Sequence, residues 1–256
     1  MTTHTYLDVV NKVLVNLREN TVSAVNATAY STLIGEFVNN AKETVEDSWP
    51  WRNLATEMTF NTVGSQVKYL LDNNGTNSPL ATSNTGRFPD DRSYILKDDK
   101  DNYQCFDTTS VASLVIYQLA YVPRERCEGD ILLAPGRSQS QPYLFTYTWE
   151  ANRPIFYMVN PPYDSRTILS RWCIPQSELV PGTDENTTLL VPWRPIVSLA
   201  TANAMRERGE ELGEKADLYE TRYNAELIRA QENDRAYAND QLKVDAVNVG
   251  GWSLNP

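Results

Sequence analysis

The chain has 256 residues, a net charge of −10, one histidine and three cysteines. This length allows one large domain or two smaller ones that bury a core without disulfide bonds. The single histidine, His4, excludes histidine-based metal clusters and argues against a Ser-His-Asp triad. The acidic balance argues against a protein that coats DNA, because phosphate binding requires a basic face.

The cysteines and the N-terminus indicate where the chain folds. Cys105, Cys127 and Cys173 are widely spaced and odd in number, which predicts reduced, buried thiols in a cytoplasm. The opening MTTHTYLDVVNKVL has no basic region followed by an apolar core, so no signal peptide is expected. No apolar run approaches the roughly 18–20 residues of a membrane-spanning helix, so no membrane contact is expected.

Two helices are predicted in the first fifty residues. Apolar residues recur at helical spacing from Tyr6 to Leu17 and again from Leu33 to Val45. The candidate N-caps are Thr3 or Thr5 for the first helix and Asn26 or Thr28 for the second. Pro50 is expected to end the second helix, since the residue before a proline is pushed out of the α region.

The middle of the chain changes to short alternating segments, which are typical of β strands. Strands are predicted at 58–63, 67–71, 94–96, 103–106, 143–149, 155–159 and 167–172. Hairpin turns are expected at 97–102 and 150–154, with a further turn at Gly64-Ser65 and a long loop over 72–91. Residues 111–122 favour a strand, with a short helix as the alternative.

The helical period returns after Pro192. A helix is predicted over 196–208, where alanines permit close packing, and Gly209 and Gly213 bracket the turn into a longer helix. The apolar stripe of that last helix steps by threes and fours to Tyr237 and stops after Asp240.

The predicted fold class is therefore α+β, an antiparallel helix bundle with a large inserted antiparallel β domain. The expected divisions are an N-terminal helix pair (1–52), the β domain (53–190), a C-terminal helix pair (191–240) and an extended tail (241–256). The stretches SWPWR and VPWRP would form an inter-domain seam of Trp49, Pro50, Trp51, Trp193 and Pro195. Alternatively, these tryptophans are ordinary core residues near loops.

The tail is the predicted partner-binding segment. Leu242, Val244 and Ala246 alternate with charged residues, as in an extended strand with one apolar side. The predicted contact residues are Leu242, Val244, Val247, Val249 and Trp252. An apolar terminus of this kind is expected to dock on a partner, and packing on its own domain is the alternative.

No catalytic, cofactor-binding or metal-binding residue is predicted. The acidic groups Asp90-Asp91 and Asp98-Asp99-Lys100-Asp101 lack the ligand spacing and central glycine of a calcium loop, so a solvated hairpin tip is favoured. Aromatic residues in the β segments could stack on sugars, but core and cross-strand packing is favoured. These aromatic residues are Tyr143, Tyr147, Trp149, Tyr157 and Trp172.

The order of the flanking helices is similar to that of a known family. The opening LDVVNKVL (7–14), the helix ending in SWPW (48–51), the return through 195–208 and the tyrosine-bearing helix 219–237 carry the likeness. Together they resemble head-to-tail adaptor proteins of tailed bacteriophages, the gatekeeper-like tail tubular connectors of short-tailed phages. The resemblance covers both flanks and leaves the β insert unmatched.

The resemblance implies a structural virion protein and not an enzyme. Such adaptors form a homo-oligomeric ring, expected as a dodecamer, between the portal protein and a tail or nozzle protein in the virion neck. They extend the DNA channel, and DNA passes through without specific binding. The alternatives are a virion-associated hydrolase of cell wall or glycan, and a carbohydrate-binding β module.

Overall fold

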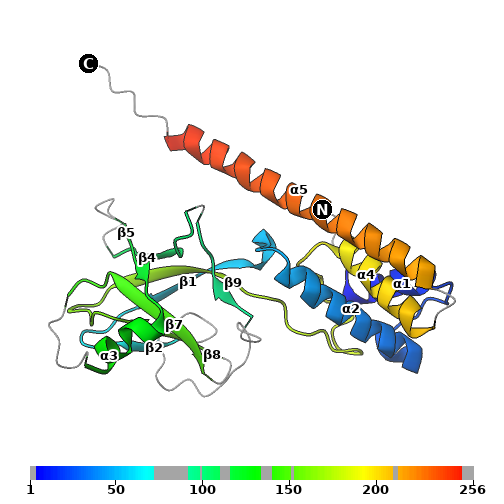
Figure 1. Ribbon diagram of the computed structural model, residues 1–256, viewed down its shortest axis with the longest axis horizontal. Helices are drawn as coiled ribbons and strands as arrows, with labels where there is room; N and C mark the ends of the chain where they lie inside the picture. The colour runs from blue at the N-terminus through cyan, green and yellow to red at the C-terminus, as the bar shows by residue number, and fades with distance from the viewer. Residues whose placement is uncertain are drawn as a thin grey trace. The chain divides into compact units, whose positions relative to one another are not determined.

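The computed structural model describes residues 4–71, 92–98, 100–109, 116–133, 140–150, 153–209 and 213–249. Over these residues the protein is mixed α+β (Figure 1). The chain divides into two compact units, Met1–Arg52 with Glu178–Pro256, and Asn53–Ser177. We refer to them as the helical unit and the β unit. The chain therefore returns to the helical unit at Glu178, whereas the sequence placed this boundary at 190.

The first two helices begin at capping boxes. In α1 (Tyr6–Asn16), the Thr5 hydroxyl accepts a hydrogen bond from the Asp8 amide, and the Asp8 carboxylate accepts one from the Thr5 amide. In α2 (Ala29–Asp47), Thr28 and Ser31 pair in the same way. Thr5 and Thr28 are each one of the two caps that the sequence proposed, so the local prediction is confirmed.

The segment that returns to the helical unit is tied to α1 by backbone hydrogen bonds. The amides of Tyr6 and Leu7 donate to the carbonyls of Thr187 at 3.0 Å and Glu185 at 3.1 Å. The first amides of a helix have no partner within the helix, and this segment supplies it. Asn39 of α2 also exchanges two hydrogen bonds with the backbone of Leu179. Residues 178–190 therefore stabilise the helices and do not belong to the sheets.

The C-terminal helices are α4 (Trp193–Glu207) and α5 (Gly213–Val249). α4 packs on α1, α2 and α5. Ala200, Ala202 and Ala204 are fully buried in it, which agrees with the small residues that the sequence indicated for close packing. α4 ends at Glu207, and Gly209, the residue after its C-cap Arg208, has a φ of 111°, a left-handed conformation that favours glycine.

The extended tail predicted after Asp240 is wrong for residues 241–249. The backbone there continues α5 without a break to Val249. The predicted strand pattern, an alternation of apolar and charged residues, covers only Leu242 to Ala246. Leu, Lys, Ala and Gln tolerate a helix well, so helix propagation from the preceding 28 positions prevails over a short alternation. Residues 250–256 lie outside the described residues.

The β unit contains two sheets. The first sheet has the order β1-β9-β4-β5, with β3 also paired to β9, and the second has the order β2-β8-β7-β6. The first sheet comprises β1 (Ala55–Asn61), β3 (Tyr94–Ile95), β4 (Cys105–Asp107), β5 (Tyr117–Gln118) and β9 (Thr167–Cys173). The second comprises β2 (Lys68–Leu70), β6 (Ala120–Tyr121), β7 (Leu144–Glu150) and β8 (Arg153–Met158). The 3₁₀ turns are η1 (Val25–Ala27) in the helical unit and η2 (Arg52–Leu54) at its boundary.

Strand pairing follows the prediction only where partners are close in sequence. The hairpin of β7 and β8 is confirmed, with Thr148 opposite Ile155. The turn after β3 closes through a bridge between Lys97 and Tyr103, but β3 and β4 then both pair with β9. β6 and β7 are parallel, so the expectation of a wholly antiparallel domain is wrong for this pair.

One helix of the β unit was not predicted. α3 (Arg124–Leu133) follows β6, in a stretch of charged residues with no apolar stripe. The predicted strand over 111–122 contains β5 and β6, while residues 110–115 lie outside the described residues. The predicted loop over 72–91 also lies outside them, as do Asp90, Asp91 and Asp99.

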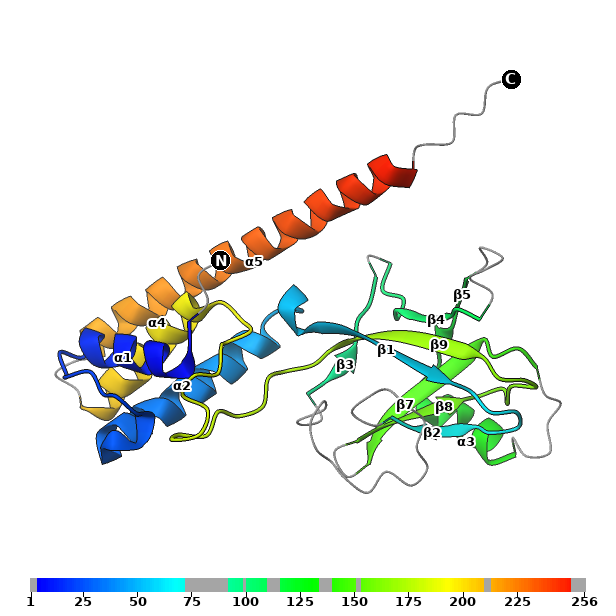
Figure 2. The ribbon, with the colours of Figure 1, turned by 180° about the vertical axis from the view of Figure 1, so that it is seen from behind.

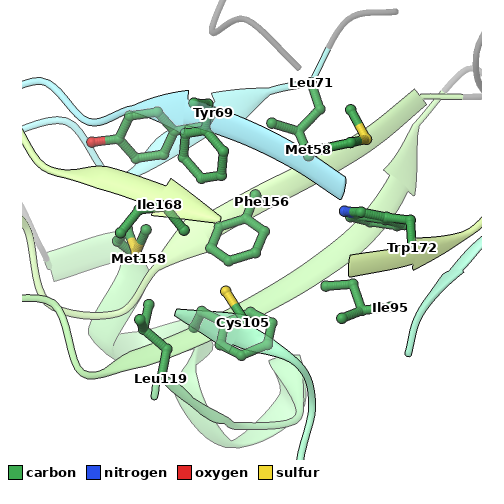
Figure 3. Close-up of a cluster of buried hydrophobic side chains, with 12 residues drawn as sticks. Met58, Tyr69, Leu71, Ile95, Cys105, Leu119, Phe156, Met158, Ile168 and Trp172 are labelled. Carbon is green, nitrogen blue, oxygen red and sulfur yellow. The ribbon is translucent and has the colours of Figure 1, made fainter. Parts of the chain in front are cut away.

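The core of the β unit is a single cluster between the two sheets (Figure 3). It combines Met58 and Trp172 from the first sheet with Tyr69 and Phe156 from the second. Phe156 stacks on Phe145 with ring centroids 4.7 Å apart. Of the aromatic residues that could stack on sugars, Tyr147 and Trp149 both pack on Trp172 in this core. Tyr157 is 8% exposed, and Tyr143 is 54% exposed.

Candidate interaction surfaces of the helical unit

The first predicted seam residues attach α2 to α5. The Trp51 indole is 2% exposed and donates to the Val45 carbonyl at 2.7 Å. This carbonyl lies in the last turn of α2 and also accepts from the amide and the hydroxyl of Ser48. The Trp49 indole donates to a carboxylate oxygen of Asp234 at 3.0 Å, and Arg52 donates to the other oxygen at 3.3 Å. Pro50 is exposed between the two tryptophans. This stretch therefore holds α5 against the C-terminal end of α2.

The second pair of seam residues lies in the first turn of α4. Pro195 is buried there, where a missing amide costs nothing because first-turn amides have no partner within the helix. Trp193 lies beside Arg222 of α5. Arg222 and Asp234 are separated by about 18 Å along a helix axis. The two Trp-Pro stretches thus contact different turns of α5, and both contacts lie within the helical unit.

Trp193 lies in a groove formed by α1, α4 and α5. The groove has a volume of about 660 Å³, and its lining includes His4, Lys12, Val15, Trp193, Val197 and Arg222. A smaller hollow of about 330 Å³ shares Trp193, Val197 and Arg222 with the groove and is also lined by Arg194 and Glu226.

Cationic side chains surround the Trp193 ring. The Lys12 ammonium is 4.7 Å from the ring centroid and the Arg194 guanidinium is 5.6 Å from it. The His4 ring lies 4.3 Å from it at an angle of 60°. These distances allow cation–π attraction, which holds both cations at the groove. Among the described residues, neither Lys12 nor Arg194 forms an ion pair with a carboxylate.

Arg222 has a different role from the other cations of the groove. Its guanidinium donates to Glu226 at 2.9 Å, and the other oxygen of Glu226 accepts from the Ser198 hydroxyl at 2.7 Å. This chain of polar contacts joins α5 to α4 and offsets the charge of Arg222. The positive charge offered to a partner beside Trp193 therefore comes from Lys12 in the groove and Arg194 in the adjoining hollow, and the groove also contains the Asp8 carboxylate.

The predicted partner-binding residues lie at the other end of α5. At 100° per residue, the backbone positions of Leu242 and Val249 fall on one side of the helix, and those of Val244 and Val247 fall near the opposite side. The single apolar side expected of an extended strand is therefore not formed by this backbone. Trp252 lies outside the described residues.

Other ionisable groups among the described residues include the cysteines and the candidate metal ligands. The three cysteines are buried thiols outside any disulfide bond, as the sequence predicted, and burial raises the pKa of the Cys105 thiol. The described residues contain no group of three or more His, Cys, Asp or Glu side chains placed to hold a metal ion. No helix among the described residues is long and apolar enough to cross a membrane.

Sequence reasoning missed the groove itself. In the sequence, Lys12 is one residue of a predicted helix, and Arg194 is one residue of the VPWRP stretch. Their proximity depends on α1 packing against α4, across about 180 residues of chain. The sequence shows one basic residue on α1 and one on α4. Local spacing does not show that both side chains lie against the same tryptophan, Trp193.

A scan against protein-family models finds no match for this chain, and a search of curated proteins finds none either.

Proposed function

We propose that the protein is a head-to-tail adaptor of a tailed bacteriophage. In this role it forms a ring below the portal, extends the DNA channel and presents a platform for the tail or nozzle. The observation that carries the proposal is the division of the chain. Its two ends, Met1–Arg52 and Glu178–Pro256, form one helical unit, and the β unit is inserted between them. This is the helix order on which the family resemblance rests.

The length and exposure of α5 support an assembling protein. α5 has 37 residues, about 55 Å, whereas α4, on which it packs, has 15 residues, about 22 Å. Both views of the ribbon show α5 running beyond the end of α4 (Figures 1 and 2). Leu218 and Ile228 on α5 are 66% and 57% exposed. A long helix with uncovered apolar side chains gains stability when a neighbouring subunit packs on it.

The acidic character of the chain fits a channel through which DNA moves. Carboxylates that face passing phosphates repel them within a screening length of about 8–10 Å at ordinary salt. The protein alone is therefore expected to show no duplex binding at physiological salt. Tight binding with a steep salt dependence would contradict this part of the proposal.

Co-assembly with the portal tests the proposal directly. The full chain is mixed with the portal protein from the same genome, and the product is examined by electron microscopy and native mass spectrometry. The expected result is a ring of this protein stacked coaxially on the portal. Absence of a complex with a well-formed portal ring would contradict the proposal. Peptidoglycan or glycan clearing in that case would instead indicate the hydrolase.

Two truncations locate the portal contact on the C-terminal end. We expect removal of residues 244–256 to abolish portal attachment with little change in thermal stability. Removal of residues 250–256 alone takes away Trp252 but leaves all described turns of α5 in place, so the two truncations separate the contribution of Trp252 from that of Val244, Val247 and Val249. If the longer truncation still binds the portal, the predicted partner-binding residues do not carry the contact.

A further inference from the structure

The outer face of α2 is acidic. Glu36, Asn40, Glu43 and Asp47 are all exposed, and helical geometry places them within a sector of about 60°. The buried stripe of the same helix lies on the opposite side and consists of Ile34, Val38, Ala41 and Val45. The three carboxylates therefore point directly away from the core of the helical unit.

This acidic face and the Trp193 groove lie on different sides of the helical unit. α2 packs on α1 and α4 but supplies no residue to the groove. In both ribbon views, α1 and α4 lie between α2 and α5 (Figures 1 and 2). One copy of the protein therefore cannot bring its own acidic face to its own groove.

The two surfaces are complementary in charge and in apolar content. The groove presents Lys12 and the 58% exposed Val15, and the adjoining hollow presents Arg194. Neither cation forms an ion pair among the described residues, whereas the Asp8 carboxylate of the groove already accepts a hydrogen bond from the Thr5 amide. The acidic face is flanked along α2 by the half-buried Leu33 and Phe37. Opposite charges around a small apolar centre are the usual composition of a specific interface.

We propose that the groove around Trp193 binds the acidic face of α2 of a second copy of this chain. Because the two faces differ, the contact is heterologous, and repetition gives a closed ring or an open filament according to the rotation per subunit. As the subunit contact of the proposed ring, this pairing depends on the proposed function for its biological role. The charge complementarity itself does not depend on it.

A set of charge reversals tests the pairing. One variant carries K12E and R194E, a second carries E36K and E43K, and a third carries all four. Self-association of the full chain is measured by sedimentation velocity and native mass spectrometry at low and high salt. Circular dichroism and thermal melting establish that each variant is folded. The matched control is E178K with E207K, which changes two exposed carboxylates of the helical unit outside both surfaces.

The wild-type protein is expected to associate at low salt and to weaken as salt is added. Each two-residue reversal should weaken association on the order of a hundredfold, because like charges then face each other. The four-residue variant should recover most of the wild-type association, and the control should match wild type. The pairing would be overturned if the wild-type protein stayed monomeric at all concentrations tested. It would also be overturned if the two-residue reversals had no effect on association, or if the four-residue variant did not recover it.

Portal co-assembly of the same variants separates this inference from the proposed function. Complete rings on the portal from either two-residue variant would overturn the pairing and leave the adaptor function intact. Self-association that follows the charge reversals, with no portal binding by wild type, would support the pairing and contradict the adaptor function. A third outcome is a wild-type protein that stays monomeric and binds duplex DNA, with binding abolished in the variant that carries K12E and R194E. That outcome would assign the groove to nucleic acid and overturn the pairing.

Discussion

The helical unit and the β unit bury their cores with different side chains. The helical unit uses mainly valine, leucine, isoleucine and alanine, with Tyr6 and Trp51 as its large buried rings, and three alanines of α4 are fully buried. The β unit relies on large residues, with Phe60, Phe145, Phe156 and Trp172 in one cluster. Helix axes approach within 8–10 Å when small side chains intervene, whereas facing sheets about 10 Å apart need large side chains from each. Stability is therefore spread over many small contacts in one unit and concentrated in a few rings in the other.

The buried ion pairs of the two units also differ in how far apart their partners lie along the chain. In the helical unit, Lys42 and Glu46 are one turn apart on α2, with the ammonium 3.3 Å from the carboxylate. In the β unit, Arg166 contacts Asp107 across two separate elements, at 3.4 Å. The first pair forms whenever α2 forms, because its partners share a helix, while the second requires the completed sheet.

The largest expected effect removes one ring from the β unit. Phe156→Ala should lower the free energy of unfolding of this unit by about 3–5 kcal/mol, since Phe156 is fully buried and stacked on Phe145. Hydrogen exchange read by mass spectrometry should rise in peptides from 53–177. Peptides from α1, α2 and α4 should keep their protection. Equal loss of protection in both units would show that they unfold together.

Breaking the buried pair of α2 should act on the helical unit instead. Lys42→Met leaves the Glu46 carboxylate buried without this cation, at an expected cost of about 3 kcal/mol. Lys42→Met with Glu46→Leu removes both charges, and we expect stability near that of wild type. Urea unfolding followed by helical circular dichroism measures both. If the double variant were as unstable as the single one, the loss of stability would not come from an unpaired buried carboxylate.

Alkaline pH should weaken the β unit through its tyrosines. Burial raises the pKa of Tyr69 and of Tyr147 from 10.0 to about 12. A folded-state pKa above the unfolded one gives a contribution that is complete below pH 10 and is lost as the pH rises toward 12. For the fully buried Tyr69 the loss is up to about 2 kcal/mol. Tyr69→Phe should reduce the pH dependence of urea unfolding between pH 9 and pH 11, and an unchanged slope would contradict the assignment.

The smallest expected effect concerns a helix cap. Thr28→Ala removes the hydroxyl that accepts from the Ser31 amide at 2.9 Å, and we expect a cost of about 1 kcal/mol. The control is Thr44→Ala on the same helix, whose hydroxyl donates to the Asn40 carbonyl. This change should be nearly neutral, because a hydroxyl that bonds back to its own helix adds little stability. If both variants lost the same free energy of unfolding, the hydrogen bond from the Ser31 amide to Thr28 would not be what stabilises the start of α2.

The sequence by itself determined the elements whose causes are local. The caps at Thr5 and Thr28, the buried stripes of α1 and α2, and the hairpin of β7 and β8 all follow from residues a few positions apart. Helical periodicity and turn chemistry act over this same range, so they can be read from one stretch of chain. The mixed α+β class followed from the same signals.

Only the tertiary structure decided which distant elements meet. Alternation of apolar and polar residues predicted that β1 and β2 are strands. It did not predict that β1 pairs with β9 and β2 with β8 in separate sheets. The same holds for Lys12 beside Trp193, and for residues 185–187, whose carbonyls accept the first amides of α1. Each of these pairings is selected by burial and hydrogen-bond satisfaction over the whole chain. A local pattern specifies that a face or an amide needs a partner, and the packed fold specifies which partner it finds.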